Sequence, residues 1–365
     1  MTQSQQDFYN CSYPELVEIL ERDFAASKFR ATQLFEWVYR KGVTDFSQMT
    51  NIGRDLRARL EQGFCFPRAT VHDRQISQDG TRKYLFEVDG GDLVEAVMIK
   101  QASRMTLCVS SQVGCAMACG FCRTGTMGLK RSLSTSEILQ QVNGVIEDAK
   151  SFGDSFSNIV FMGMGEPLHN FDNVARAVRN LTNSIGYAMS PRKVTVSTSG
   201  LVPEIRRLVE EKVNVSLAVS LNASSDEVRT QVMPVNKRWP IKELLAAVRD
   251  FAQGTRKTVT IEYVMLGGLN DTRDDMKRLV RLLHGLPVKV NLIPYNDNAG
   301  LGFNSPTRDW VFEWQRHLNQ HGLQAFIRWS KGADIAAACG QLATASKRQR
   351  PSRLPVLAGE AQAAA

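Results

Sequence analysis

The stretch Gly114-Cys115-Ala116-Met117-Ala118-Cys119-Gly120-Phe121-Cys122 carries three thiols at the spacing C-x3-C-x2-C. Three thiolates can bind three irons of a 4Fe-4S cluster, which leaves the fourth iron open to a small chelating molecule. The motif therefore predicts one iron-sulfur cluster per chain, bound by Cys115, Cys119 and Cys122 and available for chemistry.

A structural zinc site is the main alternative for clustered cysteines in a cytosolic protein. A closed zinc site needs a fourth Cys or His, usually from a second pair of ligands. The nearest downstream histidine is His169, and the sequence contains no second C-x2-C. These spacings favour an iron-sulfur cluster over zinc.

Length and charge limit the class of protein. The chain has 365 residues, 43% of them hydrophobic, which suits one large domain with a smaller accessory domain. Its 45 Lys and Arg outnumber 37 Asp and Glu, and the net charge of +8 favours polyanionic partners such as RNA.

The sequence also predicts the cellular compartment. No run approaches the roughly 18 apolar residues of a membrane span, and residues 1–7 lack the basic and apolar parts of a signal peptide. The 7 cysteines are an odd number without an evident disulfide framework, so we expect at most a transient disulfide. We therefore expect a cytoplasmic protein without a membrane partner.

The chain divides into segments of different character. Residues 12–60 repeat apolar side chains at helical spacing, which predicts a small helical accessory domain. Two alternating runs separated by Asp89-Gly90-Gly91 predict a short β-hairpin linker. The end of the chain is basic and then rich in Ala and Gly, as in disordered tails. The expected segments are residues 1–66 (accessory domain), 67–100 (linker), 101–345 (core) and 346–365 (disordered basic tail).

From residue 104 onward, β-branched runs alternate with helical stretches, a pattern that indicates a parallel sheet. An eight-unit barrel needs about 250 residues. Residues 105–293 offer fewer, so we predict an α/β fold with a partial (β/α)6 barrel. A capping box at Ser134-Thr135-Ser136-Glu137 predicts a helix start, and a seventh strand is expected at Leu323–Ile327. The six predicted strands are Met105–Val109, Ile159–Met162, Val194–Ser197, Val215–Val219, Val259–Val264 and Val288–Ile293.

Candidate active-site residues lie at or just after the ends of these strands. Parallel strands place their carboxyl ends at one edge of the sheet, where barrels carry their active groups. Each residue alone suits an ordinary polar turn, but together they predict one site. The set comprises the cysteine loop, Gly163–Glu166, Ser197, Ser220–Asn222 and Asn296.

Three separated motifs resemble the RlmN/Cfr family of radical S-adenosylmethionine (SAM) RNA methyltransferases, and its RlmN branch in particular. They are the cysteine triad, Gly163-Met164-Gly165-Glu166-Pro167 and Ala338-Cys339-Gly340-Gln341-Leu342. The similarity runs from about Lys28 to Leu342. It implies a radical SAM core and an RNA-binding role for the helical domain.

The resemblance also implies which residues contact SAM. One position departs from the family, which usually has Ser-Leu-His where this chain has Ser220-Leu221-Asn222. An amide can still donate and accept hydrogen bonds, but the ring is lost. The implied SAM-contacting residues are Gly165, Glu166, Ser197, Ser220, Leu221, Asn222 and Asn296.

Two further cysteines, Cys108 and Cys339, match the family's catalytic pair. By this resemblance Cys339 takes a methyl group from one SAM, and a second SAM supplies the radical that activates this methyl group for addition to adenine. Cys108 then attacks Cys339, which releases the RNA and leaves a disulfide to be reduced. Glu95 matches the family's candidate base, although its strand pattern alone predicts a solvent-facing residue.

The implied activity is methylation of carbon 2 of adenine in 23S ribosomal RNA, near the peptidyl transferase centre, and in tRNA beside the anticodon. The alternatives are a Cfr-type carbon-8 methyltransferase, a non-catalytic metal-containing RNA-binding protein, and a radical SAM enzyme with a non-RNA substrate. We expect a monomer served by an electron donor such as flavodoxin or ferredoxin. Arg123, Lys130 and Arg131, beside the cysteine loop, are expected to steer RNA phosphates.

Overall fold

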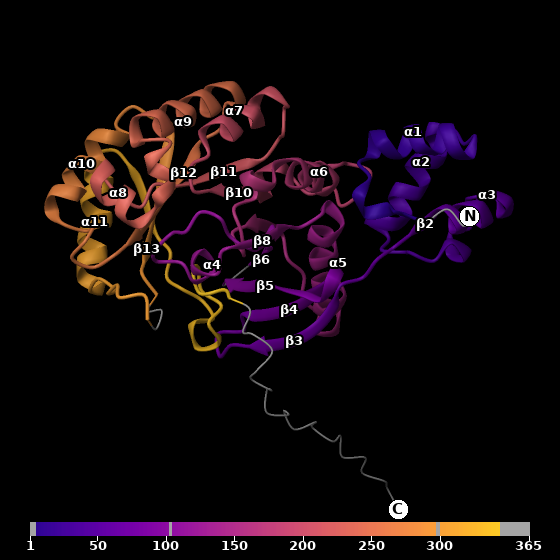
Figure 1. Cartoon of the computed structure of the whole chain (residues 1–365), viewed down its shortest axis with the longest axis horizontal. Coiled ribbons are helices and arrows are strands. Elements are labelled where there is room, and N and C mark those ends of the chain that lie inside the picture. The colour runs from indigo at the N-terminus through magenta and orange to yellow at the C-terminus, as the bar shows by residue number, and fades with distance from the viewer. Residues whose placement is uncertain (1–4, 102–103, 297–299, 344–365) are drawn as a thin grey trace, which may run out of the picture.

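The computed structural model describes residues 5–101, 104–296 and 300–343. It shows a small helical module beside a larger α/β core (Figure 1). No helix in these ranges is long and apolar enough to cross a membrane. The predicted tail, residues 346–365, lies outside the described residues.

The N-terminal module is helical, as its periodicity predicts. Its helices pack around an aromatic cluster in which the centroid of the Phe8 ring lies 5.7 Å from that of Tyr39 and 5.8 Å from that of Phe64. A two-residue parallel pairing of β1 with β2 brings the two ends of the module together. The elements are β1 (Gln6–Asp7), α1 (Tyr13–Phe24), α2 (Lys28–Phe35), a π-helical turn (Glu36–Arg40), α3 (Arg54–Gly63) and β2 (Phe64–Cys65).

Hydrogen bonds attach this module to the core. The Asn10 side chain accepts from the backbone N–H of Ser136 at 3.0 Å, and Glu15 pairs with Arg176 at 3.0 Å. The buried Asn180 amide donates to the carbonyl oxygen of Cys11 at 3.0 Å. These contacts reach helices α5 (Thr135–Ser151) and α6 (Phe171–Thr182), so the module docks on the helical layer of the core.

The core contains seven parallel strands, in the order β14-β13-β12-β11-β10-β9-β6. All six predicted strands form, because their apolar runs are buried in the sheet under the helices. The expected seventh strand is also present, as a more exposed edge strand. The strands are β6 (Arg104–Cys108), β9 (Asn158–Phe161), β10 (Val194–Thr198), β11 (Ser216–Ser220), β12 (Val259–Met265), β13 (Val288–Pro294) and β14 (Gln324–Ile327).

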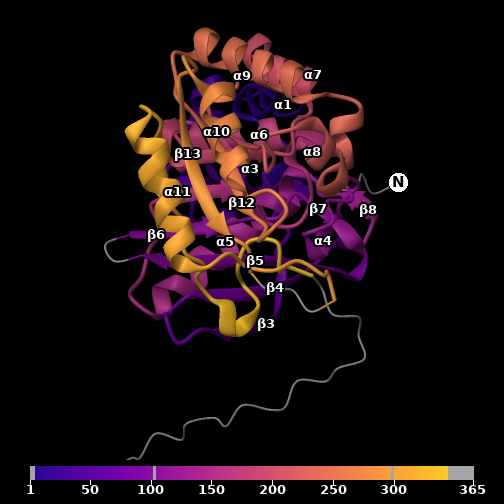
Figure 2. The same cartoon turned by 90° about the vertical axis from the view of Figure 1, so that its left-hand side faces the viewer.

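Helices connect successive parallel strands and lie on the outside of the curved sheet (Figures 1 and 2). This arrangement confirms the partial (β/α)6 barrel. The connecting helices are α5, α6, α7 (Val202–Glu210), α8 (Asp226–Val232), α9 (Ile241–Thr255), α10 (Arg273–Leu283) and α11 (Arg308–Gln320).

The segment before the core forms three strands instead of the two expected. Strands β4 (Arg82–Val88) and β5 (Asp92–Gln101) match the predicted hairpin, and β3 (Thr70–Ile76) pairs with β4. Because β5 also pairs with β6, all three strands extend the core sheet. Strand β3 escaped prediction because it is a largely exposed edge strand without an alternating apolar pattern.

The predicted capping box begins helix α5. The Ser134 hydroxyl accepts from the Glu137 N–H at 3.2 Å, and the Glu137 carboxylate accepts from the Ser134 N–H at 2.8 Å. We expect Ser134→Ala to lower the free energy of unfolding by about 1 kcal/mol, because one helix N–H loses its partner. Urea denaturation would measure the change. Ser134→Thr, which keeps the hydroxyl, should restore most of it, and equal stability of the Ala and Thr variants would contradict the assignment.

Candidate active site

A cavity of about 970 Å³, including space open to solvent, lies at the carboxyl ends of the parallel strands. It brings together most of the residues that the sequence singled out. Leu221, Cys108 and Glu95 do not line it. The predicted residues that do are Cys115, Cys119, Cys122, Gly165, Glu166, Ser197, Ser220, Asn222, Asn296 and Cys339.

The cysteine loop is held by a small antiparallel ribbon, β7 (Gln112–Gly114) with β8 (Leu129–Ser132). The Cys115 N–H donates to the Gly128 carbonyl at 2.9 Å. Gly114 has a φ of +78°, and a Cβ there would lie 1.9 Å from the Gly128 oxygen, so only glycine fits. The loop therefore leaves the ribbon in a fixed direction.

The three thiols fit an iron-sulfur cluster better than a single metal ion. All seven cysteines of the chain are free thiols. Burial raises the pKa of Cys115 to about 12 and that of Cys119 well above its usual range, so both need positive charge to ionise. Within the described ranges no three His, Cys, Asp or Glu side chains converge on one ion. A cluster is wider than an ion and binds thiolates that do not converge on one point.

A buried arginine lies beneath this loop. The Arg229 guanidinium donates to the carbonyl oxygens of Ser199 at 2.6 Å and Leu221 at 3.0 Å. It also donates to the Asn236 side chain at 2.9 Å. Burial lowers the pKa of Arg229 to about 10, while the charge of the Cys119 thiolate would raise it. Arg229 thus links the ends of β10 and β11 by hydrogen bonds, and its positive charge favours the thiolate form of the nearby cysteines.

Glu166 and the neighbouring glycines also have structural tasks. The Glu166 carboxylate accepts from the Leu168 N–H at 3.0 Å and the Ser199 N–H at 2.7 Å. A Cβ on Gly165 would lie 2.5 Å from the Gln112 side chain, and one on Gly163 would lie 2.7 Å from the Val109 oxygen. These glycines therefore allow the loop after β9 to pack closely against the segment after β6. This packing role is separate from the close approach of a cofactor, which glycine also permits.

Asn222 has a specific structural role at the position where the family usually has His. Its φ of 54° lies in the left-handed region, which Asn tolerates better than most residues. Its side-chain oxygen accepts from the Val264 N–H at 2.8 Å, and its amide faces the Met233 sulfur at 3.3 Å. The amide therefore links β12 to the turn after β11.

Residues 329–343 form a strap that carries Cys339. Asp334 accepts from the Ser77 hydroxyl at 2.6 Å, which anchors the strap to the β3–β4 turn. The Asn296 amide donates to the Cys339 carbonyl at 3.3 Å, and the Arg123 N–H donates to the Gly340 carbonyl at 2.9 Å. Asn296 therefore positions the part of the strap that carries Cys339.

A second cavity, of about 1780 Å³ including open space, runs through the interior of the barrel. Cys108 and Cys339 both line it, and Cys339 lines the first cavity as well. Burial raises the pKa of Cys108 to about 12. Cys339 is an exposed residue whose surface lines both cavities. Desolvation of its thiol in these cavities raises its pKa, while the positive charge of Arg328 lowers it.

Glu95 lines neither cavity. It is buried on β5, in contrast to the solvent-facing position that its pattern predicts. Its carboxylate pairs with Lys83 at 3.2 Å and accepts from the Ala343 N–H at 2.8 Å. Burial raises the pKa of Glu95, while Lys83 opposes this.

Sequence reasoning missed two charged residues of the site, Glu262 and Arg328. Both line the first cavity, and their side chains approach to 3.6 Å. Glu262 could have been found from the sequence, because a carboxylate within the largely apolar strand Val259–Met265 is unusual. The Glu262 Oε2 atom and the Tyr295 hydroxyl are buried at this cavity without a partner in the described chain. Such atoms fit a polar, charged ligand such as SAM.

Comparison with known proteins defines the class first. Residues 109–283 match the family model of the radical SAM superfamily. The chain aligns with the crystal structure of a radical SAM methyltransferase from Sphaerobacter thermophilus with a TM-score of 0.85 and 41% identity, covering 92% of this chain and 99% of that one. Residues 7–66 match the model described as a ribosomal RNA large subunit methyltransferase N-terminal domain.

Curated relatives define the family. A dual-specificity RNA methyltransferase RlmN from Pelobacter propionicus is 49% identical, over 92% of this chain and 95% of the relative. Another from Geobacter sulfurreducens is 50% identical, over 89% of each. The chain belongs to the RlmN family of radical SAM RNA methyltransferases.

Arg328 should set the reactivity of Cys339. We expect Arg328→Met to raise the pH at which Cys339 becomes reactive by about one pH unit, because a cation that favours the thiolate is removed. Alkylation rates measured from pH 7 to 10 by peptide mass spectrometry would report it. Arg104→Met, in the same barrel interior, is the control. A profile that moves equally in both variants would contradict a specific role for Arg328.

Proposed function

We propose that this enzyme methylates carbon 2 of adenine in 23S ribosomal RNA, at the peptidyl transferase centre, and in tRNA next to the anticodon. Relatives named dual-specificity RNA methyltransferases and the match of the N-terminal module to a ribosomal RNA methyltransferase domain support RNA as the substrate. The position of the carbon rests on the resemblance of the motifs to the RlmN branch.

Cys115, Cys119 and Cys122 would hold one 4Fe-4S cluster. The proposed SAM contacts are Gly165, Glu166, Ser197, Ser220, Leu221, Asn222 and Asn296. When bound, the cluster and two SAM molecules per turnover supply an electron, a carbon radical and the methyl group. Apolar side chains such as Met233 and Val264 line the cavity and limit the access of water.

The observation that carries the proposal is that Cys339 lines two cavities while Cys108 lines the second. As a thiolate, Cys339 can accept a methyl group on the side of the first cavity. It can then present that methyl group to adenine on the side of the barrel interior. Cys108 then attacks the Cys339 sulfur: a transient disulfide forms, and the bond between that sulfur and the methylene carbon of the resulting protein-RNA adduct breaks. The released carbon keeps the electron pair and takes up a proton to become the methyl group of the RNA.

Glu95 is the proposed base that removes the proton from the adenine ring. A carboxyl with a raised pKa accepts a proton near neutral pH more readily than an exposed one. Its contact with the Ala343 N–H must open for this step. Before the transfer, Lys83 stabilises the carboxylate form of Glu95 that accepts the proton.

The proposed setting is the cytoplasm, with the enzyme a monomer reduced by a flavodoxin or ferredoxin. Among the alternatives, a Cfr-type enzyme would use the same cysteines and modify carbon 8 instead. Family membership sets aside the non-catalytic RNA-binding protein, because the curated relatives are named methyltransferases.

The product distinguishes carbon 2 from carbon 8. We expect anaerobically reconstituted enzyme, given methyl-labelled SAM and unmodified 23S rRNA or tRNA, to yield labelled 2-methyladenosine after RNA digestion. Nucleoside chromatography with mass spectrometry would measure it, and boiled enzyme is the control. Labelled 8-methyladenosine would overturn the carbon assignment, and the absence of label in tRNA would overturn dual specificity.

Cys108→Ala should leave the adduct unresolved. We expect this variant to accumulate a covalent protein-RNA species, because no second thiol can attack Cys339. A denaturing gel with labelled RNA would detect it. Cys65→Ala, a cysteine that lines neither cavity, should turn over normally. Free methylated RNA from Cys108→Ala in wild-type amounts would contradict the role of Cys108.

A further inference from the structure

The barrel interior holds a second cavity, which adjoins the proposed SAM cavity and shares Met162, Ile293, Arg328 and Cys339 with it. It is lined by alternate residues of the parallel strands, for example Arg104, Thr106 and Cys108 on β6, and by the strap on the open side of the barrel. It encloses about 1780 Å³ including open space, so it opens to the outside and can admit a segment of a polymer.

The charged side chains that line this interior cavity are all positive. Arg104, Lys289, Arg328 and Lys331 line it, and none of its described lining residues is Asp or Glu. Arg104, Lys289 and Lys331 form no ion pair within the described chain. By contrast, Lys130 and Arg131, expected to steer phosphates, are paired with two carboxylates, Asp92 and Glu137. The interior therefore offers unneutralised cations to an anionic ligand.

Aromatic rings lie beside these cations. Phe326, on edge strand β14, is 50% exposed, and Trp329, at the start of the strap, is 38% exposed. Both line the interior cavity. Exposed aromatic rings next to cations are the usual means of binding single-stranded nucleic acid, because bases stack on rings while cations contact phosphates.

We propose that the barrel interior binds the single-stranded RNA segment that carries the target adenosine. Arg104, Lys289 and Lys331 contact its phosphates, and Phe326 and Trp329 stack on its bases. The inference rests on the proposed function and extends it to the path of the substrate. Because Cys339 lines both cavities, SAM and RNA can reach one sulfur from different sides. A base must leave its own stack to enter.

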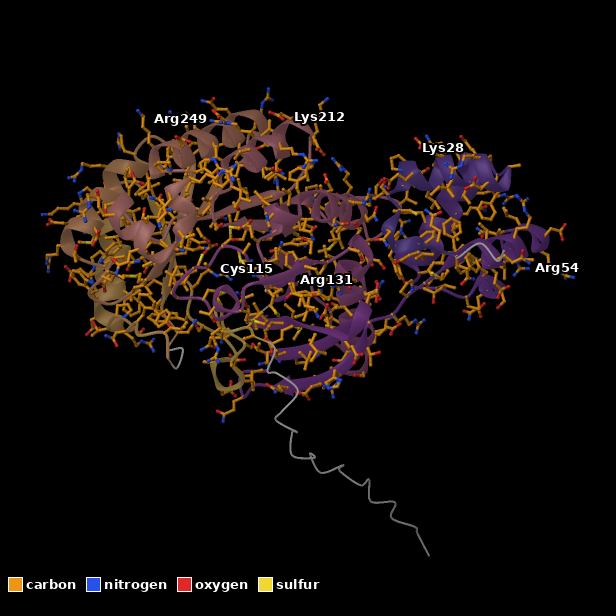
Figure 3. The ribbon with its side chains drawn as sticks, in the orientation of Figure 1. Lys28, Arg54, Cys115, Arg131, Lys212 and Arg249 are labelled. Carbon is orange, nitrogen blue, oxygen red and sulfur yellow. The ribbon has the colours of Figure 1, made fainter. Side chains whose placement is uncertain are left out.

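The test compares two triple variants of the full-length holoenzyme with equal loss of charge. The first is Arg104→Gln/Lys289→Gln/Lys331→Gln. The control is Lys212→Gln/Lys242→Gln/Arg249→Gln, whose side chains are exposed outside the barrel; Figure 3 shows Lys212 and Arg249 at the outer helical layer. The probe is a fluorescent RNA stem-loop with an unpaired adenosine, titrated by anisotropy at several salt concentrations.

We expect the interior variant to bind the RNA at least about tenfold more weakly. Its plot of log affinity against log salt should be less steep by about 2, since each phosphate contact on a single strand contributes about 0.7. The control should keep the wild-type slope. KM for RNA should rise more than kcat falls, and methyl loading of Cys339, measured by mass, should persist.

Trp329→Ala provides an independent readout at constant charge. We expect it to weaken RNA binding about five- to a hundredfold without changing the salt slope, and Trp329→Phe to restore most of the affinity. Circular dichroism would confirm that each variant is folded.

Equal RNA affinity and slope in the interior and control variants would overturn the inference, provided that wild-type enzyme methylates adenosine. If wild-type enzyme methylates no adenosine, the proposed function itself fails. Slower reduction of the Cys108–Cys339 disulfide by an anionic thiol, with unchanged RNA binding, would assign the cavity to a small reductant and likewise overturn the inference.

Discussion

The carboxyl ends of the parallel strands are held in place by one buried cation, Arg229. It donates to the carbonyl oxygens of Ser199, Ser220 and Leu221, which lie at the ends of the neighbouring strands β10 and β11. Its hydrogen-bond partners in the described chain are all neutral, and a buried charge without a counter-ion is costly. Negative charge at the nearby Cys119 reduces that cost. One side chain therefore links the geometry of the strand ends to the charge that the cysteine loop can hold.

The sequence predicted the parts of the fold in which burial imposes a clear pattern. The apolar parallel strands and the helix at Ser134 are of this kind, because strands covered on both faces and capped helices have strong local signals. Strand β3 has little such signal: five of its seven residues carry charged or polar side chains, and most are exposed. Its place in the sheet is set by its pairing with β4, which no local pattern encodes.

The candidate site was predictable where its residues belong to motifs. The cysteine triad, the Gly163–Pro167 turn and Cys339 were all found in this way. Glu262 and Arg328 were missed because each is a single charged residue in an otherwise ordinary strand or strand end. Only the fold brings them within 3.6 Å of each other beside Cys339. Asn222 shows the reverse case, because the motif did not explain why Asn stands where the family usually has His. In the structure its backbone is left-handed, and its side-chain oxygen accepts a hydrogen bond from Val264 of β12.

The two cysteines of the barrel differ in ways that fit the proposed order of their reactions. Cys108 lies within β6 and is fixed by pairing on both sides, and burial raises its pKa to about 12. Cys339 lies on a strap, faces two cavities and has Arg328 to favour its thiolate. The first step needs a nucleophile that reaches the methyl donor, and Cys339 lines the first cavity with Arg328 opposing the rise in its pKa. The last step needs a thiol that stays protonated while the methyl group is transferred, because a methylated Cys108 could no longer attack the Cys339 sulfur to release the RNA. The surroundings of Cys108 meet that requirement.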